Sequence, residues 1–301
     1  MARWTERDIP SQRGRTAVVT GANSGIGFET ARALAEKGAR VLLACRNSSK
    51  AEEAARRIRP ADGGAVDVVE LDLGSLGSVR ACCARLNETV DGIDLVVCNA
   101  GVMMPPGRRE TADGFELQLG TNHLGHFALV DGLLDKVQTR DGSRVVVVAS
   151  TAHKFGKIDF SDLQWEQRKF KRWASYGQSK LANLLFTYEL ARRLERAGSS
   201  TIVAASHPGW TNTNLQRDVS SFQWMGALLA MKAPQGALPS LHAATAPDVR
   251  SGDYFGPDGM GEMRGWPKKV QSTPASHDRA VAERLWDVSC ELTGARYAAL
   301  S

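Results

Sequence analysis

Residues 16–27 read Thr16-Ala17-Val18-Val19-Thr20-Gly21-Ala22-Asn23-Ser24-Gly25-Ile26-Gly27, and this stretch decides the fold. Its first five residues are typical of a short buried strand, and an amphipathic helix follows and ends near Gly38. One glycine could belong to an ordinary tight turn. Three glycines at a single strand-to-helix junction favour a backbone that turns sharply and approaches an anion. The sequence therefore predicts a βα unit whose helix N-terminus faces a pyrophosphate.

The rest of the chain repeats this alternation. The predicted strands are continuous Val, Leu and Ala runs, which is typical of a parallel sheet covered on both faces. They span residues 16–20, 40–45, 67–72, 94–98, 144–149 and 201–206, and the predicted helices span about 25–37, 49–58, 76–88, 112–136, 175–197 and 278–293. We find no internal sequence repeat and no linker between domains. The sequence predicts an α/β fold: one domain over residues 1–301, with a doubly wound, Rossmann-type, mostly parallel sheet and helices on both faces.

Polar and glycine residues follow the predicted strands. Right-handed crossovers place the carboxyl ends of parallel strands along one edge of the sheet, where ligands bind. The residues at or just past these ends are Gly21, Arg46, Asp72, Asn99, Ser150 and Pro208. We expect them to converge on one site.

Tyr176 and Lys180 are spaced as i and i+4 in Tyr176-Gly177-Gln178-Ser179-Lys180, before an apolar helical run. On a helix these two side chains share a face. A free tyrosine has a pKa of about 10, and a neighbouring cation lowers it. An exposed helix face would give the same spacing. With the glycine turn, the pair instead indicates a proton donor and acceptor that operates near neutral pH.

Further motifs carry a resemblance to a known family. They are Asn99-Ala100-Gly101 after one strand, Asn122 within Thr121-Asn122-His123-Leu124-Gly125, Ser150 at the end of another strand, and Pro208-Gly209 after a third. With them, the chain resembles the short-chain dehydrogenase/reductase family over roughly residues 12 to 295. Its Ala44-Cys45-Arg46 and His207-Pro208-Gly209 segments are most similar to the retinol dehydrogenase and protochlorophyllide reductase-like branch.

The resemblance implies a catalytic set of four residues, Asn122, Ser150, Tyr176 and Lys180. Tyr176 would exchange a proton with the substrate oxygen, and Ser150 would hydrogen-bond that oxygen. Lys180 would hold the nicotinamide ribose and lower the pKa of the tyrosine. Asn122 would anchor a water that links Lys180 to solvent, or serve as a helix-kink residue; the two roles are compatible.

It also implies a set of dinucleotide-binding residues. They are Gly21, Asn23, Ser24, Gly25, Ile26, Gly27, Arg46, Asp72, Leu73, Asn99, Ala100, Gly101, Tyr176, Lys180, Pro208, Gly209, Thr211 and Thr213. For Asp72, a contact to the adenine amino group and a cap on the following helix are equally compatible with the sequence.

Arg46 indicates which dinucleotide is bound. An acidic residue after the second strand would bind the ribose 2′-hydroxyl and repel a 2′-phosphate. This chain has Arg46 there, whose guanidinium matches phosphate oxygens, although a solvated surface arginine is the alternative. The sequence predicts NADP(H) as the cofactor.

Two segments are expected to shape the substrate site. The separation of Ser150 and Tyr176 is about twice that of many family members, and the extra residues, about 154–173, match the longer insert of the branch. For His153, next to this insert, a structural role is favoured over a catalytic one. Residues 210–270 are rich in Trp, Met and Leu with interspersed Gly, which is compatible with core packing and with an apolar substrate-covering lobe. We expect a small lipophilic substrate.

Composition restricts the classes of function. The chain has a net charge of +5, and its basic residues are interleaved with acidic ones. Because no basic stripe with aromatics is present, nucleic acid is not an expected partner. The five cysteines lack disulfide or metal-site spacing, which predicts no metal and a reducing, cytoplasmic location. No signal peptide or integral membrane segment is expected. A homo-oligomer remains open.

The sequence thus predicts an NADP(H)-dependent oxidoreductase that interconverts a carbonyl and an alcohol by hydride transfer. Two alternatives stay open. One is a C=C reductase of the protochlorophyllide reductase type, in which Tyr176 donates to carbon. The other is a protein that senses dinucleotide without turnover, although such a protein has no need of all four predicted catalytic residues.

Overall fold

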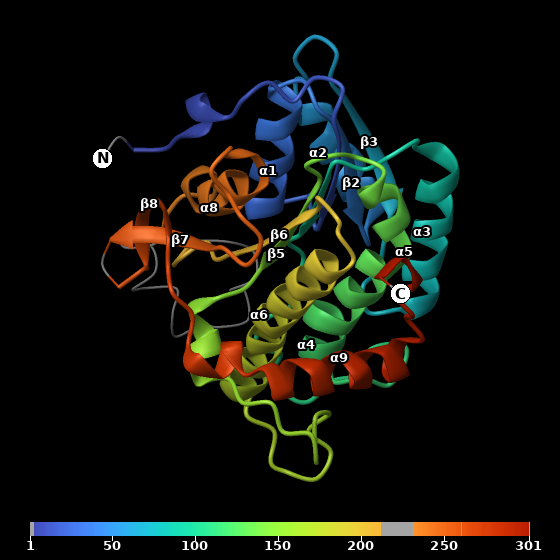
Figure 1. The fold of residues 1–301 in the computed structure, drawn as a ribbon, viewed down its shortest axis with the longest axis vertical. Helices are drawn as coiled ribbons and strands as arrows, with labels where there is room; N and C mark the ends of the chain where they lie inside the picture. The colour runs from blue at the N-terminus through green and yellow to red at the C-terminus, as the bar shows by residue number, and fades with distance from the viewer. Residues whose placement is uncertain (1–2, 212–230, 260, 301) are drawn as a thin grey trace.

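The computed structural model describes residues 3–211, 231–259 and 261–300. Within these residues the chain forms an eight-stranded sheet in the order β3-β2-β1-β4-β5-β6-β7-β8 (Figure 1). Neighbouring strands are parallel except for the β7–β8 pair, which is antiparallel. The strands are β1 (Thr16–Thr20), β2 (Arg40–Cys45), β3 (Ala65–Glu70), β4 (Leu95–Cys98), β5 (Arg144–Val148), β6 (Ile202–Ser206), β7 (Tyr254–Gly259) and β8 (Arg264–Lys269). The predicted doubly wound fold is confirmed.

Helices cover both faces of the sheet (Figure 1). One layer holds α1 (Gly25–Glu36), α2 (Ser48–Arg57) and α8 (Ala233–Thr245). The other holds α3 (Leu76–Thr89), α5 (Gly125–Gln138) and α6 (Arg172–Arg196), with α9 (Arg279–Thr293) packed outside α5 and α6. Short helical turns are η1 (Glu6–Asp8), α4 (Leu117–Leu119), η2 (Gly120–Leu124), η3 (Thr151–Phe155), η5 (Pro274–His277) and η6 (Ala298–Leu300).

The continuous apolar strands are explained by this covering. Successive side chains of a strand point to opposite faces of the sheet. In β1, Ala17 and Val19 pack in the α1 layer, whereas Val18 packs in the α3 and α5 layer, and all three are fully buried. A strand that faces helices on both sides therefore needs apolar residues at every position.

The structure corrects the predicted helix over residues 112–136. Gly114 has a φ of +83°, and the amide of Phe115 donates to Oγ1 of Thr111, so this segment is a turn. Helix begins only at Leu117, passes through the π-helical turn η2 and continues as α5. The error arises because tertiary contacts hold the segment as a turn: the amide of Ala112 donates to the carbonyl of Gly74, and the Asp113 carboxylate accepts from the amide of Leu76.

The region 210–270 also differs in part from the expected lobe. Residues 212–230 and 260, which include Thr213 and several of the large apolar side chains, lie outside the described residues. Of the remainder, α8 packs on α1, and β7 and β8 extend the sheet. Trp210 and Met263 of this region line the cavity described below, and the covering lobe over residues 210–270 stays a prediction.

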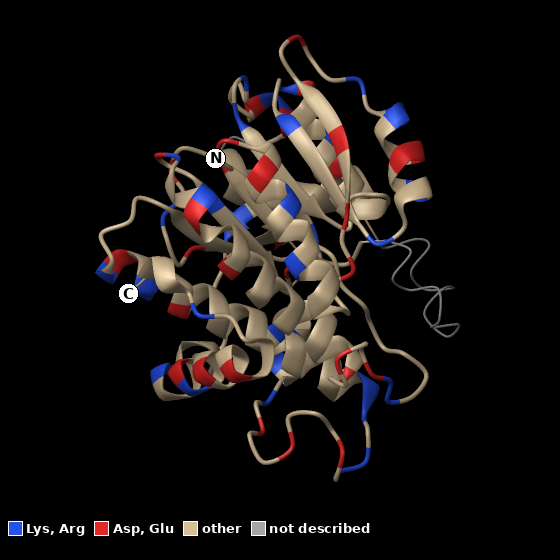
Figure 2. Cartoon of the chain, turned by 90° about the vertical axis from the view of Figure 1, so that its right-hand side faces the viewer, with Lys and Arg blue, Asp and Glu red and all other residues tan. Residues whose placement is uncertain are grey.

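The charge distribution agrees with the interleaving noted in the sequence. On the side of the molecule drawn in Figure 2, basic and acidic residues alternate along the outer helices. Several form ion pairs; Arg32 contacts both Glu29 and Glu36 on α1, for example.

Candidate active site

One cavity of about 680 Å³ lies where the turns after β1, β2, β3, β4, β5 and β6 meet. This is the ligand-binding edge of a doubly wound sheet. The cavity brings together nearly all of the predicted residues that the structure describes: Gly21, Asn23, Ser24, Gly25, Ile26, Gly27, Arg46, Asp72, Leu73, Asn99, Ala100, Gly101, Ser150, Tyr176, Lys180, Pro208, Gly209 and Thr211. Asn122 lies behind this lining, and Thr213 lies outside the described residues.

The glycine turn has the shape that an anion site needs. Gly21 and Gly25 have φ values of +67° and +58°, which favour glycine. The amide of Gly21 donates to the carbonyl of Ala44, which fixes the turn against β2. Ser24 precedes α1 but makes no side-chain cap, so the first amides of this helix keep free hydrogen-bonding capacity at the cavity.

Gly27 allows this turn to pack against the chain after β4. A Cβ at position 27 would lie 2.4 Å from Nδ2 of Asn99 and 2.5 Å from the carbonyl oxygen of Gly21. Gly27→Ala is therefore expected to push the turn away from Asn99, destabilise the fold by about 1–3 kcal/mol and weaken dinucleotide binding by at least about tenfold.

Gly77→Ala is a matched control, because its Cβ would meet only Oγ of Ser75 at 3.7 Å. Thermal unfolding and titration with NADPH, followed by nicotinamide fluorescence, measure the two effects. Wild-type affinity in Gly27→Ala would show that close packing at this glycine is not required.

A buried threonine and histidine order the segment after β4. The amides of Asn99 and Ala100 both donate to Oγ1 of Thr20, at 2.9 Å. Thr20 Oγ1 lies 2.9 Å from Nε2 of His126, and Nδ1 of His126 donates to the carbonyl of Asn122 at 3.0 Å. Burial lowers the pKa of His126 to about 4, so the ring is neutral and can accept at Nε2.

Asn122 lies in the π-turn η2 and holds a neighbouring loop. Its Oδ1 accepts from the amide of Val102 at 2.8 Å, and its Nδ2 donates to the Val102 carbonyl and to Oγ of Ser179, both at 3.0 Å. The Asn122 side chain therefore holds the loop after β4 against α6. These contacts account for the helix-kink role; the proposed water link stays a prediction.

Ser150, Tyr176 and Lys180 meet in the cavity from two elements. Ser150 follows β5 and Tyr176 lies on α6, and both side chains line the cavity. Lys180, 4% exposed, donates from Nζ to the carbonyl of Val148 at 2.9 Å. Its Nζ lies 5.8 Å from the centre of the Tyr176 ring. The geometry places a hydroxyl, a phenol and an ammonium around one space.

The acidities differ from the sequence-based expectation. Burial raises the pKa of Tyr176 to about 12, and the Ser150 hydrogen bond offsets only part of this rise. Burial also lowers the pKa of Lys180 to about 8. The predicted lowering of the tyrosine pKa by Lys180 is thus absent in the free protein, where burial is the largest cause of the shift. At neutral pH the phenol carries its proton.

His153 has a structural position. Its Nδ1 donates to the carbonyl of Ser150 at 2.7 Å, and its Nε2 accepts from the amide of Thr273 at 3.3 Å. Both ring nitrogens are therefore engaged with the main chain. Burial lowers its pKa, which agrees with a neutral ring that joins the end of β5 to the segment before η5.

The far end of the cavity contains Arg46, Asp72 and Lys50. Arg46 is exposed, and no hydrogen bond or ion pair joins it to any residue that the structure describes. Asp72 accepts from the amide of Gly74 at 2.9 Å, whereas Ser75 caps α3. The capping alternative for Asp72 is therefore wrong. Lys50, in the first turn of α2, adds a second cation to the lining of the cavity.

The mouth of the cavity is apolar. Among the residues that the structure describes, the exposed large hydrophobic side chains are Phe155 (79% exposed), Trp173 (49%) and Met263 (42%), and all three line the cavity. Trp210 lines it too, and the ring of Trp173 lies 6.5 Å from that of Tyr176. Phe155 and Trp173 stand at the two ends of the insert.

Sequence reasoning missed Thr20, His126 and Ser179 as supporting residues. Their partners are far away in the chain: Thr20 and His126 come from β1 and α5. No local pattern marks such a contact.

The described residues contain no candidate metal site and no disulfide. In the described part of the chain, no group of three or more His, Cys, Asp or Glu could hold a metal ion. All five cysteines are free, and four of them are buried. None of the described helices has the length and apolar character required to cross a bilayer.

The chain is similar in sequence to known proteins. The family model for short chain dehydrogenase matches residues 15–224. The chain is 43% identical to retinol dehydrogenase 13 from Homo sapiens, over 93% of this chain and 85% of that protein. It is 44% identical to retinol dehydrogenase 12 from Homo sapiens, over 94% of this chain and 88% of that protein.

Solved structures are similar as well. An uncharacterised protein from Mycobacterium paratuberculosis matches 98% of this chain and 99% of its own, with 42% identity and a TM-score of 0.84. The Pseudomonas aeruginosa RhlG/NADP active-site complex matches 81% of this chain and 94% of its own, with 25% identity and a TM-score of 0.63.

Proposed function

The chain belongs to the short-chain dehydrogenase family of alcohol/carbonyl oxidoreductases with nicotinamide cofactors, and from this we propose that it is NADP(H)-dependent and acts on a lipophilic small molecule. One observation carries the proposal. Ser150, Tyr176 and the buried Lys180 line the same cavity as the glycine turn at the start of α1. A proton donor and a phosphate site therefore share one continuous space.

The cavity fits a dinucleotide. Gly27 leaves no room for a Cβ beside Asn99 and Gly21, so the turn is tightly packed. The N-terminus of α1 and the side chain of Arg46 both line the cavity. Bound NADPH would supply the hydride. The glycine turn would hold the pyrophosphate through main-chain amides, and Lys180 would bind the nicotinamide ribose.

The proposed proton chemistry follows from the acidities. In the free protein at neutral pH, the Tyr176 phenol is protonated and can donate to a carbonyl oxygen that becomes an alkoxide. Ser150 donates a second hydrogen bond to that oxygen and orients it. Asn122, bonded to Val102 and Ser179, keeps the loop after β4 and the α6 turn in fixed positions.

NADP(H) is proposed over NAD(H) because of charge. Arg46 is exposed at the cavity, Lys50 stands nearby, and no acidic residue occupies the end of β2. A similar structure is a complex with NADP. A 2′-phosphate would be attracted by these cations.

A lipophilic substrate is proposed because the side chains at the mouth of the cavity are apolar. Phe155, Trp173, Trp210 and Met263 offer apolar surface beside Tyr176. The curated relatives are retinol dehydrogenases, whose named substrate is an alcohol. For the location we propose the cytoplasm, since four of the five free thiols are buried and unpaired, as is common in a reducing compartment.

The test is consumption of NADPH by purified protein with a panel of lipophilic aldehydes, ketones and quinones. We expect turnover with at least one carbonyl and formation of the alcohol, identified by mass spectrometry. A saturated C=C bond with an intact carbonyl in the product would instead support the C=C reductase. Tight NADPH binding without hydride transfer to any compound would support the sensing protein.

A further inference from the structure

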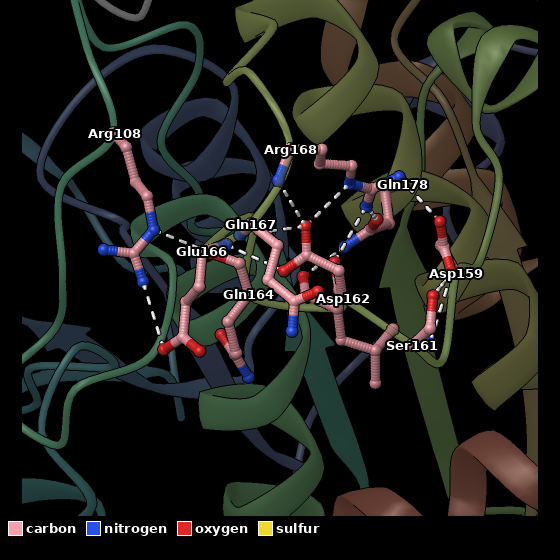
Figure 3. Close-up of polar contacts among 10 residues, drawn as sticks. Arg108, Asp159, Ser161, Asp162, Gln164, Glu166, Gln167, Arg168 and Gln178 are labelled. Atoms are coloured by element: carbon pink, nitrogen blue, oxygen red, sulfur yellow. Dashed lines mark hydrogen bonds and ion pairs between the residues drawn. The ribbon is translucent and has the colours of Figure 1, made fainter.

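The insert, residues 154–173, has its own polar core (Figure 3). The Asp162 carboxylate accepts main-chain N–H bonds from Glu166 at 2.7 Å, Gln167 at 3.3 Å and Arg168 at 3.0 Å. One side chain thus closes the loop from 162 to 168. Such a loop is held by its own hydrogen bonds without a bound substrate.

Arg168 lies at the centre of this loop. Its guanidinium contacts the Asp159 carboxylate at 3.3 Å and the Asp162 carbonyl at 3.0 Å, and it stacks over the Trp165 ring with its central carbon 3.6 Å from the ring centre. The same guanidinium donates to Oε1 of Gln178 at 2.9 Å. Gln178 belongs to α6, so the insert is joined to that helix by a charge-assisted bond.

Gln178 is the second half of the connection. It is fully buried, and its Nε2 donates to the carbonyl of Leu163 at 2.8 Å. Both polar groups of the amide are therefore bonded to the insert. Because Gln178 lies midway between Tyr176 and Lys180, the helical repeat directs it to the face opposite theirs. The insert therefore contacts the side of the 176–180 helical turn that faces away from the cavity.

The insert itself is anchored on its other side. Nε of Arg108 donates to the carbonyl of Gln164 at 2.8 Å, and the Gln164 side chain accepts from the amide of Glu116 at 2.7 Å. Arg108 also contacts Glu166 at 3.6 Å (Figure 3). It contacts Glu110 at 2.6 Å as well. The insert therefore connects the segment before α4 to α6.

Neighbouring residues of the same turn are held as well. Ser175 accepts from Nε2 of Gln118 at 2.9 Å, and Ser179 accepts from Nδ2 of Asn122 at 3.0 Å. At Gly177 a Cβ would lie 2.8 Å from the carbonyl oxygen of Ala152. Gly177 also packs closely against Gly156 of the insert, whereas the side-chain hydrogen bonds of Gln178 go to Leu163 and Arg168 in its central part.

We propose that the central part of the insert, residues 159–168, sets the position of the Tyr176–Lys180 turn, and that Gln178 is a positioning residue acting through its bonds to Arg168 and Leu163. The proposal rests on the proposed function, since it assigns Tyr176 and Lys180 to the chemistry. A displacement of about 1 Å at a reacting group can cost about 100-fold in rate, which gives such a support a catalytic effect.

Gln178→Met keeps the length of the side chain and removes both hydrogen bonds, and Arg168→Lys keeps the charge and removes the forked guanidinium. We expect kcat to fall by about 10- to 100-fold in Gln178→Met and less in Arg168→Lys. The NADPH dissociation constant should stay within about threefold, because the glycine turn is untouched. The pH profile of kcat should also shift. Gln167→Ala is the control, since the Gln167 side chain is exposed and only its amide bonds to Asp162.

All rates are expressed per NADPH-binding site, so that misfolded protein does not count. If Gln178→Met lowers the melting temperature but retains wild-type kcat and pH profile, Gln178 is only structural and the proposal is overturned. Hydrogen exchange supplies a readout without turnover: amides of residues 175–180 should lose protection in Gln178→Met and not in Gln167→Ala. Should wild-type protein show no turnover at all, the proposed function fails, and this exchange result alone decides whether the insert positions the turn.

The same experiment separates a positioning segment from a substrate-induced cover. We expect the amides of Glu166, Gln167 and Arg168 to be protected equally with and without substrate, because they already donate to the Asp162 carboxylate in the free protein. Protection that arises only when substrate binds would show that the insert orders around the ligand, and would contradict the proposal.

Discussion

Tyr176→Phe is expected to lose nearly all turnover, by about 10²- to 10⁴-fold, while it binds NADPH as the wild type does. The substitution removes one hydroxyl and leaves the ring that packs beside Trp173. The hydroxyl is the group that carries a proton at neutral pH. Initial rates of NADPH consumption and a fluorescence titration of NADPH binding measure the two quantities separately.

Tyr188→Phe is the matched control. Tyr188 lies on the same helix, but its hydroxyl bonds to Ser272 at 2.7 Å and it is not among the residues that line the cavity. This variant should keep its rate and lose a little stability. If Tyr176→Phe retained a rate within about threefold of the wild type, tyrosine would be excluded as the general acid.

The two directions of the reaction should depend differently on pH. Reduction needs the neutral phenol, and because the pKa of Tyr176 is raised to about 12 in the free protein, its proton is available throughout the neutral range. Oxidation needs the phenolate, so its kcat/KM should rise with pH from about 6 to about 9, whereas that of reduction stays flat or falls. Opposite slopes would indicate that another group transfers the proton.

Arg46→Asp is expected to invert the preference for cofactor. A charge-assisted bond between arginine and phosphate is worth roughly 1.5–3 kcal/mol, which corresponds to a preference for NADPH of about 10- to 100-fold. The variant should bind NADPH much more weakly and NADH equally well or better. Dissociation constants of both dinucleotides, for wild type and variant, provide the measurement.

Because Arg46 is exposed, part of this effect is a screened Coulomb attraction that should shrink as salt rises. Measurements at two ionic strengths test this. Arg56→Asp is the control: Arg56 is exposed on α2 and the charge change is the same, but it does not line the cavity. Equal wild-type affinities for NADH and NADPH would mean that Arg46 is a solvated surface residue and that the NADP(H) assignment is wrong.

Local patterns predicted the framework of this protein. The apolar run of β1 and the glycine turn into α1 appear in the structure where the sequence indicates them, because strand, turn and helix are each encoded by adjacent residues. The convergence of Gly21, Arg46, Asp72, Asn99, Ser150 and Pro208 on one cavity followed from the same alternation, since parallel strands end on one edge. The positions of these residues were therefore open to prediction.

Contacts between segments that are distant in the chain could not be predicted from local patterns. The π-turn around Asn122 depends on Val102 and Ser179, and the support of α6 by the insert depends on Arg168 and Gln178. In each case the partners meet only after the chain has folded, and no periodicity marks them.

The acidities show the same division. The spacing of Tyr176 and Lys180 indicated a coupled pair, and the structure does place both in one cavity. It also buries them, so that the pKa of the phenol rises to about 12 and that of the ammonium falls to about 8. The sequence by itself determined which groups are present and on which strand ends and helix faces they stand. Only the tertiary structure decided how much water surrounds them, and desolvation, which depends on every segment packed around a group, sets their charge.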